Sequence, residues 1–126
     1  MGDEVRSDLK YTDTHEWIKI EGDIARVGIT DHAQSELTDI VFVELPQIGK
    51  EIREGDELCV VESVKSVSEI YAPISGKIAN INKQIEESPE IINESPYDEG
   101  WLIEIEIVDK SEINALLSAD SYKKMI

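Results

Sequence analysis

The sequence predicts a mainly β fold, and three kinds of observation support this. Short runs rich in β-branched and aromatic residues recur along the chain, their apolar positions alternate, and turn signals separate them. The runs are HEWIKI, IARVGI, IVFVEL and WLIEIEIV, with EGD, PQIGK and ESPYDEG as intervening turns or loops. A length of 126 residues with 40% hydrophobic residues fits a single domain over residues 1–126.

The first third of the chain is expected to contain a loose leader, two strands and a helix. Residues 1–10, MGDEVRSDLK, are expected to be a short, loosely ordered segment. In WIKI and IARVGI the alternation gives each strand one apolar face. Asp31 could cap a short helix at residues 31–37, with Gln34 three residues on as in a capping box.

The stretch VVESVKSVSEIYAP, residues 60–73, fits two patterns. Its valines have spacings that one face of a helix could show, but they are β-branched and turn signals enclose them. Gly55 precedes the run, while Pro73 and Gly76 follow it, which favours two short strands with Lys65 near a hairpin tip. Four glycines suit turns, and PISG is a turn in which Gly76 could need positive φ. These glycines are Gly22, Gly49, Gly55 and Gly76.

The C-terminal third is expected to hold a loop, a strand and one or two helices. The acidic segment 86–100 is expected to be a mobile or partner-facing loop. The strand IEIEIV should bury Ile103, Ile105 and Ile107 and expose the glutamates between them. Ser111 could cap an amphipathic helix SEINALL. The apolar face of that helix would consist of Ile113, Leu116 and Leu117.

Charge and cysteine content exclude several classes of function. Twelve basic and 28 acidic residues give a formal net charge of −16, which would repel nucleic acid and anionic membrane surfaces. A single cysteine, Cys59, excludes an internal disulfide, and its apolar neighbours predict that it is buried. The first ten residues contain no apolar segment of the secretory kind, so the expected location is the cytoplasm.

Lys65 is the basic residue with the most unusual surroundings. It is the only one between Glu54 and Gly76, a stretch that also contains five acids. It could be a solvated turn lysine in weak ion pairs, worth at most about 1 kcal/mol. A Schiff-base nucleophile needs a lowered pKa, whereas acidic neighbours favour the ammonium form. We therefore expect any covalent chemistry at Lys65 to require a separate enzyme.

Other catalytic patterns are weak. His15 and His32 each stand beside an acid, but adjacent residues of a strand point in different directions, and no nucleophile completes a triad. The sequence has no zinc, calcium or phosphate-loop pattern, and we expect no active site of its own.

Several separated segments resemble one known family. ESVKSVSEIYAP resembles the lipoyl-attachment motif of the glycine cleavage system H proteins, and HEWIKIEGDIARVGITDHAQSELTDIVFVELP and NESPYDEGWLIEI are similar to two further segments of that family. The resemblance runs from about Tyr11 to Tyr122. It implies a barrel-sandwich hybrid with short helices near residues 31–37 and at the C-terminus, and an exposed hairpin that carries the modified lysine.

The resemblance also implies a carrier that is not itself an enzyme. Lipoate would be attached through an amide to Lys65, and Glu62 and Gly76 would help a lipoate ligase or a lipoyl/octanoyl transferase to recognise the hairpin. The partners implied are a pyridoxal-phosphate glycine decarboxylase, a tetrahydrofolate-dependent aminomethyltransferase and a flavin-dependent dihydrolipoamide dehydrogenase. The carrier would act as a monomer.

In this family a surface cleft holds the loaded arm, and its residues match Thr14, Glu16, His32 and Glu69 here. The family commonly has aspartate where this chain has Glu69, one carbon longer. Our hypothesis is that Glu16 and Glu69 attract the loaded amine while Thr14 and His32 shape the pocket. Glu16 and Glu69 could instead be ordinary surface acids, and His32 an ordinary helix N-terminal residue.

Three related functions compete with this interpretation. A biotin carrier usually has methionines on both sides of its lysine, whereas Lys65 lies between Val64 and Ser66. The lipoyl domain of a 2-oxo-acid dehydrogenase usually has aspartate before the lysine and belongs to a larger acyltransferase. A relay protein that donates its lipoyl or octanoyl group to other enzymes needs the same hairpin, so the sequence leaves that alternative open.

Overall fold

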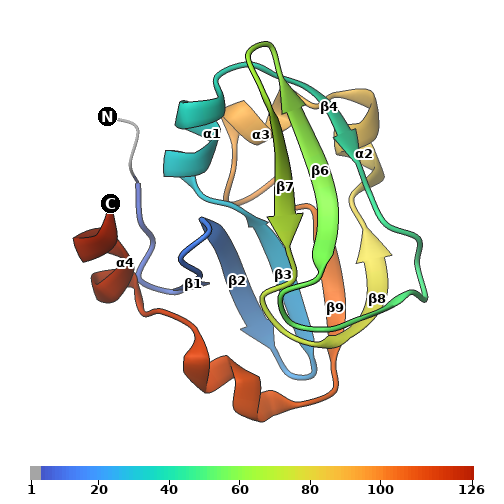
Figure 1. The fold of residues 1–126 in the computed structure, drawn as a ribbon, viewed down its shortest axis with the longest axis vertical. Coiled ribbons are helices and arrows are strands. Elements are labelled where there is room, and N and C mark those ends of the chain that lie inside the picture. Colours follow the sequence, from blue (N-terminus) through green and yellow to red (C-terminus); the bar gives the residue numbers. More distant parts are fainter. Residues whose placement is uncertain (1–3) are drawn as a thin grey trace.

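A computed structural model of the chain describes residues 4–126, which form two antiparallel β-sheets and several short helices (Figure 1). One sheet has six strands in the order β1-β2-β3-β9-β8-β5, and the other has three in the order β4-β6-β7. The strands are β1 Lys10–Tyr11, β2 Glu16–Glu21, β3 Ile24–Ile29, β4 Ile40–Glu44, β5 Glu51–Ile52, β6 Glu57–Ser63, β7 Val67–Tyr71, β8 Gly76–Ile81 and β9 Ile103–Ile107. The helices are α1 Asp31–Leu37, α2 Lys83–Glu87, α3 Ile91–Glu94, the 3₁₀ helix η1 Lys110–Ala115 and α4 Ala119–Met125.

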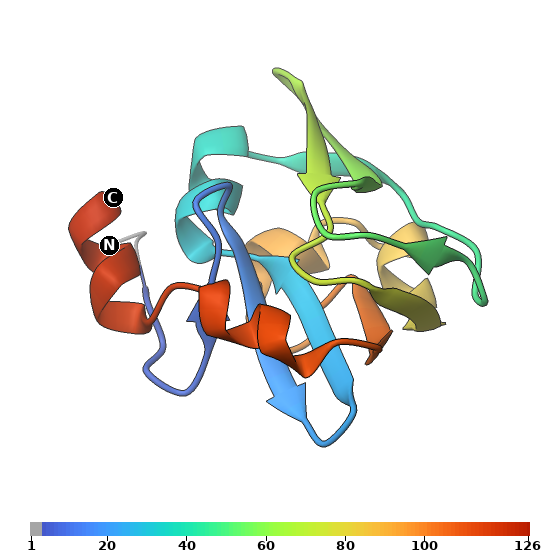
Figure 2. The same ribbon diagram turned by 60° about the horizontal axis from the view of Figure 1, so that its bottom comes forward.

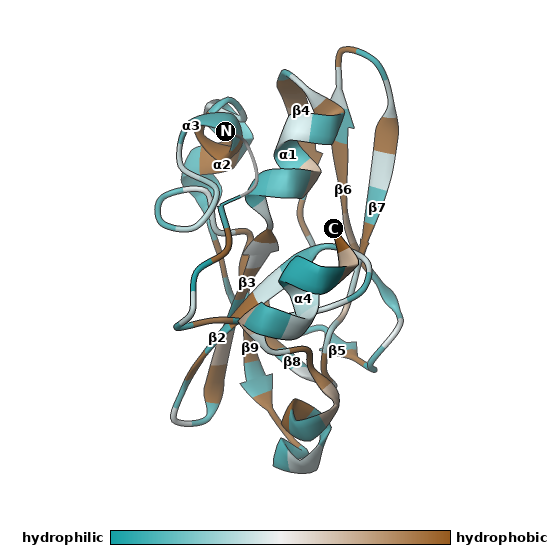
Figure 3. Cartoon of the chain, turned by 90° about the vertical axis from the view of Figure 1, so that its left-hand side faces the viewer, coloured by the Kyte–Doolittle hydropathy of each residue, from teal (hydrophilic) through white to brown (hydrophobic). Residues whose placement is uncertain are grey.

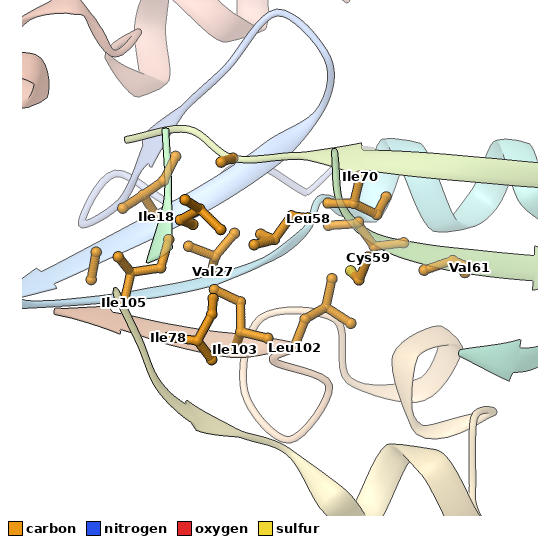
Figure 4. Close-up of a cluster of buried hydrophobic side chains, with 14 of the residues drawn as sticks. Ile18, Val27, Leu58, Cys59, Val61, Ile70, Ile78, Leu102, Ile103 and Ile105 are labelled. Atoms are coloured by element: carbon orange, nitrogen blue, oxygen red, sulfur yellow. The ribbon is translucent and has the colours of Figure 1, made fainter. Parts of the chain in front are cut away.

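The main core lies between the two sheets and consists mostly of isoleucine, valine and leucine (Figure 4). Strand β9 shows how the sequence builds it: Ile103, Ile105 and Ile107 are buried while Glu106 is exposed. The predicted alternation of this strand is confirmed. Cys59 is buried in the same core, also as predicted, and burial raises the pKa of its thiol. The mainly β fold class is likewise confirmed.

A second, aromatic cluster joins the two ends of the chain. It contains Leu9, Tyr11, Trp17, Tyr97, Ala119 and Tyr122. The rings of Tyr11 and Tyr122 stack with centroids 4.6 Å apart, which ties α4 to the beginning of the sheet. Residues 4–10 were expected to be loose, but Leu9 is buried and Arg6 pairs with Asp98 at 2.9 Å. Residues 1–3 of the expected leader lie outside the described residues.

The helix predicted over residues 31–37 is confirmed as α1, but two helices have other caps than the sequence predicted. Thr30, not Asp31, caps α1, because its hydroxyl accepts the Ala33 N–H while Asp31 accepts from the Gln34 amide. The expected helix SEINALL is instead the 3₁₀ helix η1, and the Asp109 carboxylate caps it by accepting the Ser111 N–H at 3.0 Å.

The acidic segment 86–100, predicted as a loop, contains the end of α2 and all of α3. Ile92 is buried in the core, and the Asn93 amide donates to the Thr38 carbonyl and accepts the Ile40 N–H, both at 2.8 Å. Asn82 donates to the carbonyls of Glu99 and Trp101, also at 2.8 Å. Two buried or half-buried amides therefore satisfy backbone groups that a loop would leave to solvent.

None of the helices in residues 4–126 combines the length and the apolar character needed to cross a bilayer.

Candidate functional site

Lys65 is exposed at the tip of the β6–β7 hairpin, which projects away from the rest of the molecule (Figure 2). The register pairs Glu62 with Val67 and Val61 with Ser68, so the turn spans Ser63 to Ser66. The two-strand interpretation of residues 60–73 is therefore confirmed over the helical one. Towards the base of the hairpin, Val61 and Ile70 are buried, which anchors both strands in the core.

Ser63 holds the turn that presents Lys65. Its hydroxyl accepts the N–H of Lys65 at 3.2 Å and that of Ser66 at 3.1 Å, and its own N–H donates to the Ser66 carbonyl at 2.8 Å. Serine is favoured in turns because its short side chain can bond the backbone two or three residues on. Sequence reasoning missed this residue, although a serine two positions before the lysine was the available signal.

Glu16 is a buried acid at the beginning of β2. Only 1% of its surface is exposed, and its carboxylate accepts the hydroxyls of Thr12 and Thr14, each at 2.5 Å. The Tyr71 N–H, at the end of β7, donates to its other oxygen at 3.4 Å. Burial raises the pKa of Glu16, and the hydrogen bonds oppose that rise. Within residues 4–126 no cation forms an ion pair with this carboxylate.

A groove runs between α1 and β7, beside the hairpin. It has a volume of about 230 Å³ and is lined by Thr14, His15, His32, Ser68 and Ile70, among others. The rings of His15 and His32 lie 4.9 Å apart. Burial lowers the pKa of His15, and the nearby His32 lowers it further. Three of the predicted cleft residues thus lie close together: Thr14 contacts Glu16 and shares this groove with His32.

Glu16 borders a second, neighbouring cavity of about 480 Å³ rather than the groove itself. This cavity lies between the segment before β2, the end of β7 and the segment after η1, and Tyr71 and Leu116 help to line it. Thr14 borders both hollows and its hydroxyl donates to Glu16. The carboxylate therefore lies behind Thr14 when approached from the groove.

Glu69 is not brought together with the other three. It lies opposite Val60 in the sheet register, and Val60 lies opposite Glu44, so these three side chains share the outer face of the three-stranded sheet. Its carboxyl is hydrogen-bonded to that of Glu57, which raises the pKa of Glu57. The cause is strand alternation: because Ile70 enters the core, its neighbour Glu69 points to the other side.

Gly76 lies in β8, in the other sheet, and its φ is not positive, unlike those of Gly22, Gly49 and Gly55. A Cβ at position 76 would lie 2.2 Å from the Glu106 carbonyl oxygen. The expected reason for this glycine, a turn with positive φ, is corrected to a close approach between the backbones of β8 and β9. Glu62, in contrast, is half-buried on β6 three residues before Lys65.

A two-sheet β fold that holds one lysine on a projecting hairpin, with a groove beside it, is the arrangement expected of a carrier protein.

Comparison with known proteins identifies the family. Residues 9–126 match the family model described as glycine cleavage H-protein. The chain is 56% identical to the glycine cleavage system H protein of Staphylococcus haemolyticus and 58% identical to that of Staphylococcus epidermidis, each over 97% of both chains. A crystal structure of a glycine cleavage system H protein from Mycobacterium marinum superposes with a TM-score of 0.85 at 37% identity, over 95% of this chain and 97% of that one. The chain belongs to the glycine cleavage H-protein family, a family of lipoyl carriers.

Proposed function

We propose that Lys65 carries lipoate and that the arm shuttles an aminomethyl group among the enzymes of the glycine cleavage system. The observation that carries the proposal is the position of Lys65, exposed in a turn that Ser63 holds and that the hairpin base anchors in the core. The groove beside β7 fits an attached arm, because it begins close to the lysine and is lined by apolar and polar side chains.

The dimensions of the hairpin support this fit. Strand residues advance about 3.3 Å each, so Ser68 lies about 10 Å and Ile70 about 17 Å along the chain from Lys65. A lysine side chain extended by an eight-carbon acyl group spans roughly 14 Å by ordinary bond lengths. An arm laid back along β7 therefore ends between these two residues, both of which line the groove.

Once attached to Lys65, lipoate would supply a cyclic disulfide that is reduced as one sulfur takes up the aminomethyl group from glycine decarboxylase. The dithiol left after delivery to the tetrahydrofolate-dependent aminomethyltransferase would be reoxidised by dihydrolipoamide dehydrogenase. The chain's own residues protect that cargo. Glu16 is a buried carboxylate that pairs with no cation in residues 4–126, so a protonated amine nearby would gain a charge-assisted partner. Thr14, which donates to Glu16, lies between the groove and the carboxylate, and His32 forms part of the groove wall. Glu69 would have no part in this pocket, because its side chain lies on the outer face of the hairpin sheet.

The attachment itself is an acyl transfer that requires a lipoate ligase or a lipoyl/octanoyl transferase. The Lys65 amine attacks the carbonyl carbon of an acyl-adenylate or acyl thioester, the amide N–C bond forms as the bond to AMP or thiol breaks, and the amine's extra proton passes to a base of the enzyme.

The decisive experiment is mass spectrometry of the protein and its peptides after expression with a lipoylating enzyme. We expect one lipoyl group, on Lys65, and none in the variant Lys65→Arg. Glycine-dependent exchange of carbon dioxide with glycine decarboxylase then tests the shuttle role. A protein that is lipoylated at Lys65 but supports no exchange would fit the relay function instead.

A further inference from the structure

Thr12, which follows β1, is joined to Glu16 at the beginning of β2 by three hydrogen bonds. The Thr12 N–H donates to the Glu16 carbonyl at 3.0 Å, and the Glu16 N–H donates to the Thr12 hydroxyl oxygen, also at 3.0 Å. The third bond runs from the Thr12 hydroxyl to the carboxylate oxygen Oε1 of Glu16 at 2.5 Å. One side chain thus binds both the main chain and the carboxylate of Glu16, which restricts the rotamers open to that carboxylate.

The hydroxyl donors are distributed unequally over the two oxygens of this carboxylate. A threonine hydroxyl has one hydrogen to donate, and both Thr12 and Thr14 donate theirs to Oε1, which brings the two hydroxyl oxygens to 3.3 Å from each other. The other oxygen, Oε2, accepts the Tyr71 N–H at 3.4 Å, which is longer than usual for such a bond. Among the described residues, Oε2 is therefore the oxygen of Glu16 with capacity left for a further donor.

Oε2 is bonded at the point where β7 leaves the groove. Tyr71 is the last residue of β7 and directly follows Ile70, which lines the groove. Figure 3 shows hydrophobic and hydrophilic residues alternating along this strand. Thr12 borders the neighbouring cavity of about 480 Å³ together with Glu16, whereas the groove wall includes Thr14 but not Thr12. Thr12 is therefore placed to act on the carboxylate from behind rather than to contact an occupant of the groove.

Thr12 also bears on the charge of the carboxylate. Burial raises the pKa of Glu16, and Asp13, a like charge, adds to this rise. The hydrogen bonds from Thr12 and Thr14 oppose the rise, because a hydroxyl hydrogen stabilises the ionised form. The remaining titratable groups of the cavity wall are Glu54 and two tyrosines, and no lysine, arginine or histidine of residues 4–126 belongs to that wall. The ionised state of Glu16 therefore depends on these neutral donors.

We propose that Thr12 is a positioning residue for the retention of cargo: it fixes the Glu16 carboxylate as an anion whose Oε2 is presented to the protonated amine on the arm. This rests on the proposed function, in which Glu16 pairs with that amine. Thr12 itself touches neither the arm nor the amine, so its whole effect passes through Glu16. A threonine that served only to form the turn would affect stability alone.

The first test uses unloaded protein and follows the titration of Glu16 by NMR of labelled glutamate carboxyl carbons, with Glu16→Gln identifying the signal. Thr12→Val replaces the hydroxyl by a methyl group of similar size, whereas Thr12→Ser keeps the hydroxyl. We expect the titration midpoint of Glu16 to move upward in Thr12→Val, because a hydrogen bond to the anion is lost, and to stay at the wild-type value in Thr12→Ser. An unmoved midpoint in Thr12→Val would overturn the proposal.

The second test is the rate of aminomethyl loss from lipoylated, loaded protein, measured at several pH values above the wild-type midpoint of Glu16. We expect loss from Thr12→Val to be about fivefold faster than from wild type, the equivalent of one ordinary hydrogen bond, and loss from Thr12→Ser to match wild type. The double variant Thr12→Val/Glu16→Gln should lose the group no faster than Glu16→Gln alone, because the effects of residues that act through one another do not add. Additive effects would give Thr12 a role independent of Glu16 and contradict the proposal.

Denaturant unfolding of every variant separates a change in the fold from a change at Glu16. If Thr12→Val does not fold, Thr12→Ala, which also lacks the hydroxyl, takes its place in both tests. A Thr12→Ser protein as impaired as Thr12→Val would show that the methyl group matters and not the hydroxyl, which would also overturn the proposal.

The two tests also separate this proposal from the proposed function. Wild-type protein that is not lipoylated at Lys65, or a Glu16→Gln variant that keeps its cargo as well as wild type, would refute the proposed function. The NMR titration needs no arm, so an unmoved midpoint of Glu16 refutes the positioning role of Thr12 by itself.

Discussion

The Tyr122 hydroxyl lies 2.7 Å from His15 Nδ1 and 2.8 Å from the Thr30 hydroxyl, so the C-terminal helix α4 is hydrogen-bonded to the segment that precedes Glu16. His15 has a φ of 71°, a left-handed conformation that costs energy for any residue other than glycine. The N–H of Thr30 donates to the His15 carbonyl at 3.0 Å and helps to hold it. The end of the chain thus fixes the loop that carries Thr14.

Replacing Tyr122 by phenylalanine should destabilise the protein without disturbing the stack on Tyr11. The variant loses a buried hydroxyl and leaves Thr30 and His15 without that partner, so the free energy of unfolding should fall by about 1–3 kcal/mol. Denaturant unfolding at neutral pH measures this. An unchanged free energy would mean that the hydroxyl is not what holds the loop.

Replacing Glu16 by glutamine should change how stability depends on pH. Because burial raises the folded-state pKa of Glu16 above 4.5, the folded protein binds this proton more tightly than the unfolded chain, and ionisation costs stability as pH rises through that window. The glutamine variant does not pay this cost. Its free energy of unfolding, relative to wild type, should therefore increase from pH 4 upward and level off above the folded-state pKa. Denaturant titrations at several pH values measure this difference in free energy of unfolding between variant and wild type. A difference that stays constant or falls as pH rises would contradict the raised pKa of Glu16.

The same variant should also lose its cargo faster. In lipoylated, aminomethyl-loaded protein, Glu16→Gln removes the negative charge that we expect to hold the amine, so the rate of aminomethyl loss should rise about tenfold, the equivalent of one charge-assisted hydrogen bond. Quenched-flow samples analysed by mass spectrometry give this rate. Glu69→Gln is the control, because its carboxyl lies on the other face of the sheet; a larger effect at Glu69 than at Glu16 would reverse the assignment.

Replacing Gly76 by alanine should destabilise the fold by at least about 2 kcal/mol, since the new methyl group would overlap the Glu106 carbonyl oxygen. Lipoylation of this variant should fall only in proportion to its unfolded fraction. Thermal unfolding gives the unfolded fraction, and acylation measured on the same samples gives the loss of lipoylation to be compared with it. A fully folded variant that is poorly acylated would restore direct recognition of Gly76 by the enzyme.

Cys59 should behave as a probe of unfolding. It is the only thiol in the sequence, it is buried, and burial raises its pKa, which disfavours the reactive thiolate. Alkylation by iodoacetamide in native conditions should be slower than in denaturant by about a thousandfold or more, the factor set by ordinary domain stability. Mass spectrometry over time measures both rates, and fast native labelling would show local opening of β6.

The sequence predicted those features that depend on local patterns. Ile103 and Ile105 alternate with glutamates, and the valines around Lys65 are β-branched and enclosed by turns, so the strands and the hairpin could be recognised. Features that depend on contacts between distant segments could not. The order of segment 86–100 rests on Asn93, whose partners lie 53 and 55 residues earlier, and the burial of Glu16 rests on threonines and on β7.

The position of Glu69 is a different case, because the sequence contained the information. Ile70 is apolar and adjacent, so once this segment is a strand with Ile70 inside, Glu69 must lie outside. The resemblance to the family motif placed Glu69 in the cleft, whereas the alternation of side chains along the strand places it on the outer face of the sheet. The caps of α1 and η1 were ambiguous for a simpler reason: Thr30 and Asp31, like Asp109 and Ser111, are all capable of capping.

The hairpin has one further consequence for how the molecule works. The core ends at Val61 and Ile70. Beyond them the tip is held by its own ladder, by the pairing of β4 with Glu62 and Ser63, by the Ser63 hydroxyl and by the bond from the Val64 N–H to the Asp39 carbonyl. Chemical change at Lys65 is therefore separated from the part of the molecule that determines its stability. Attaching the arm should therefore not lower the melting temperature, and an arm held in the groove can only raise it, so the protein can pass through many cycles of use without any of them weakening its fold.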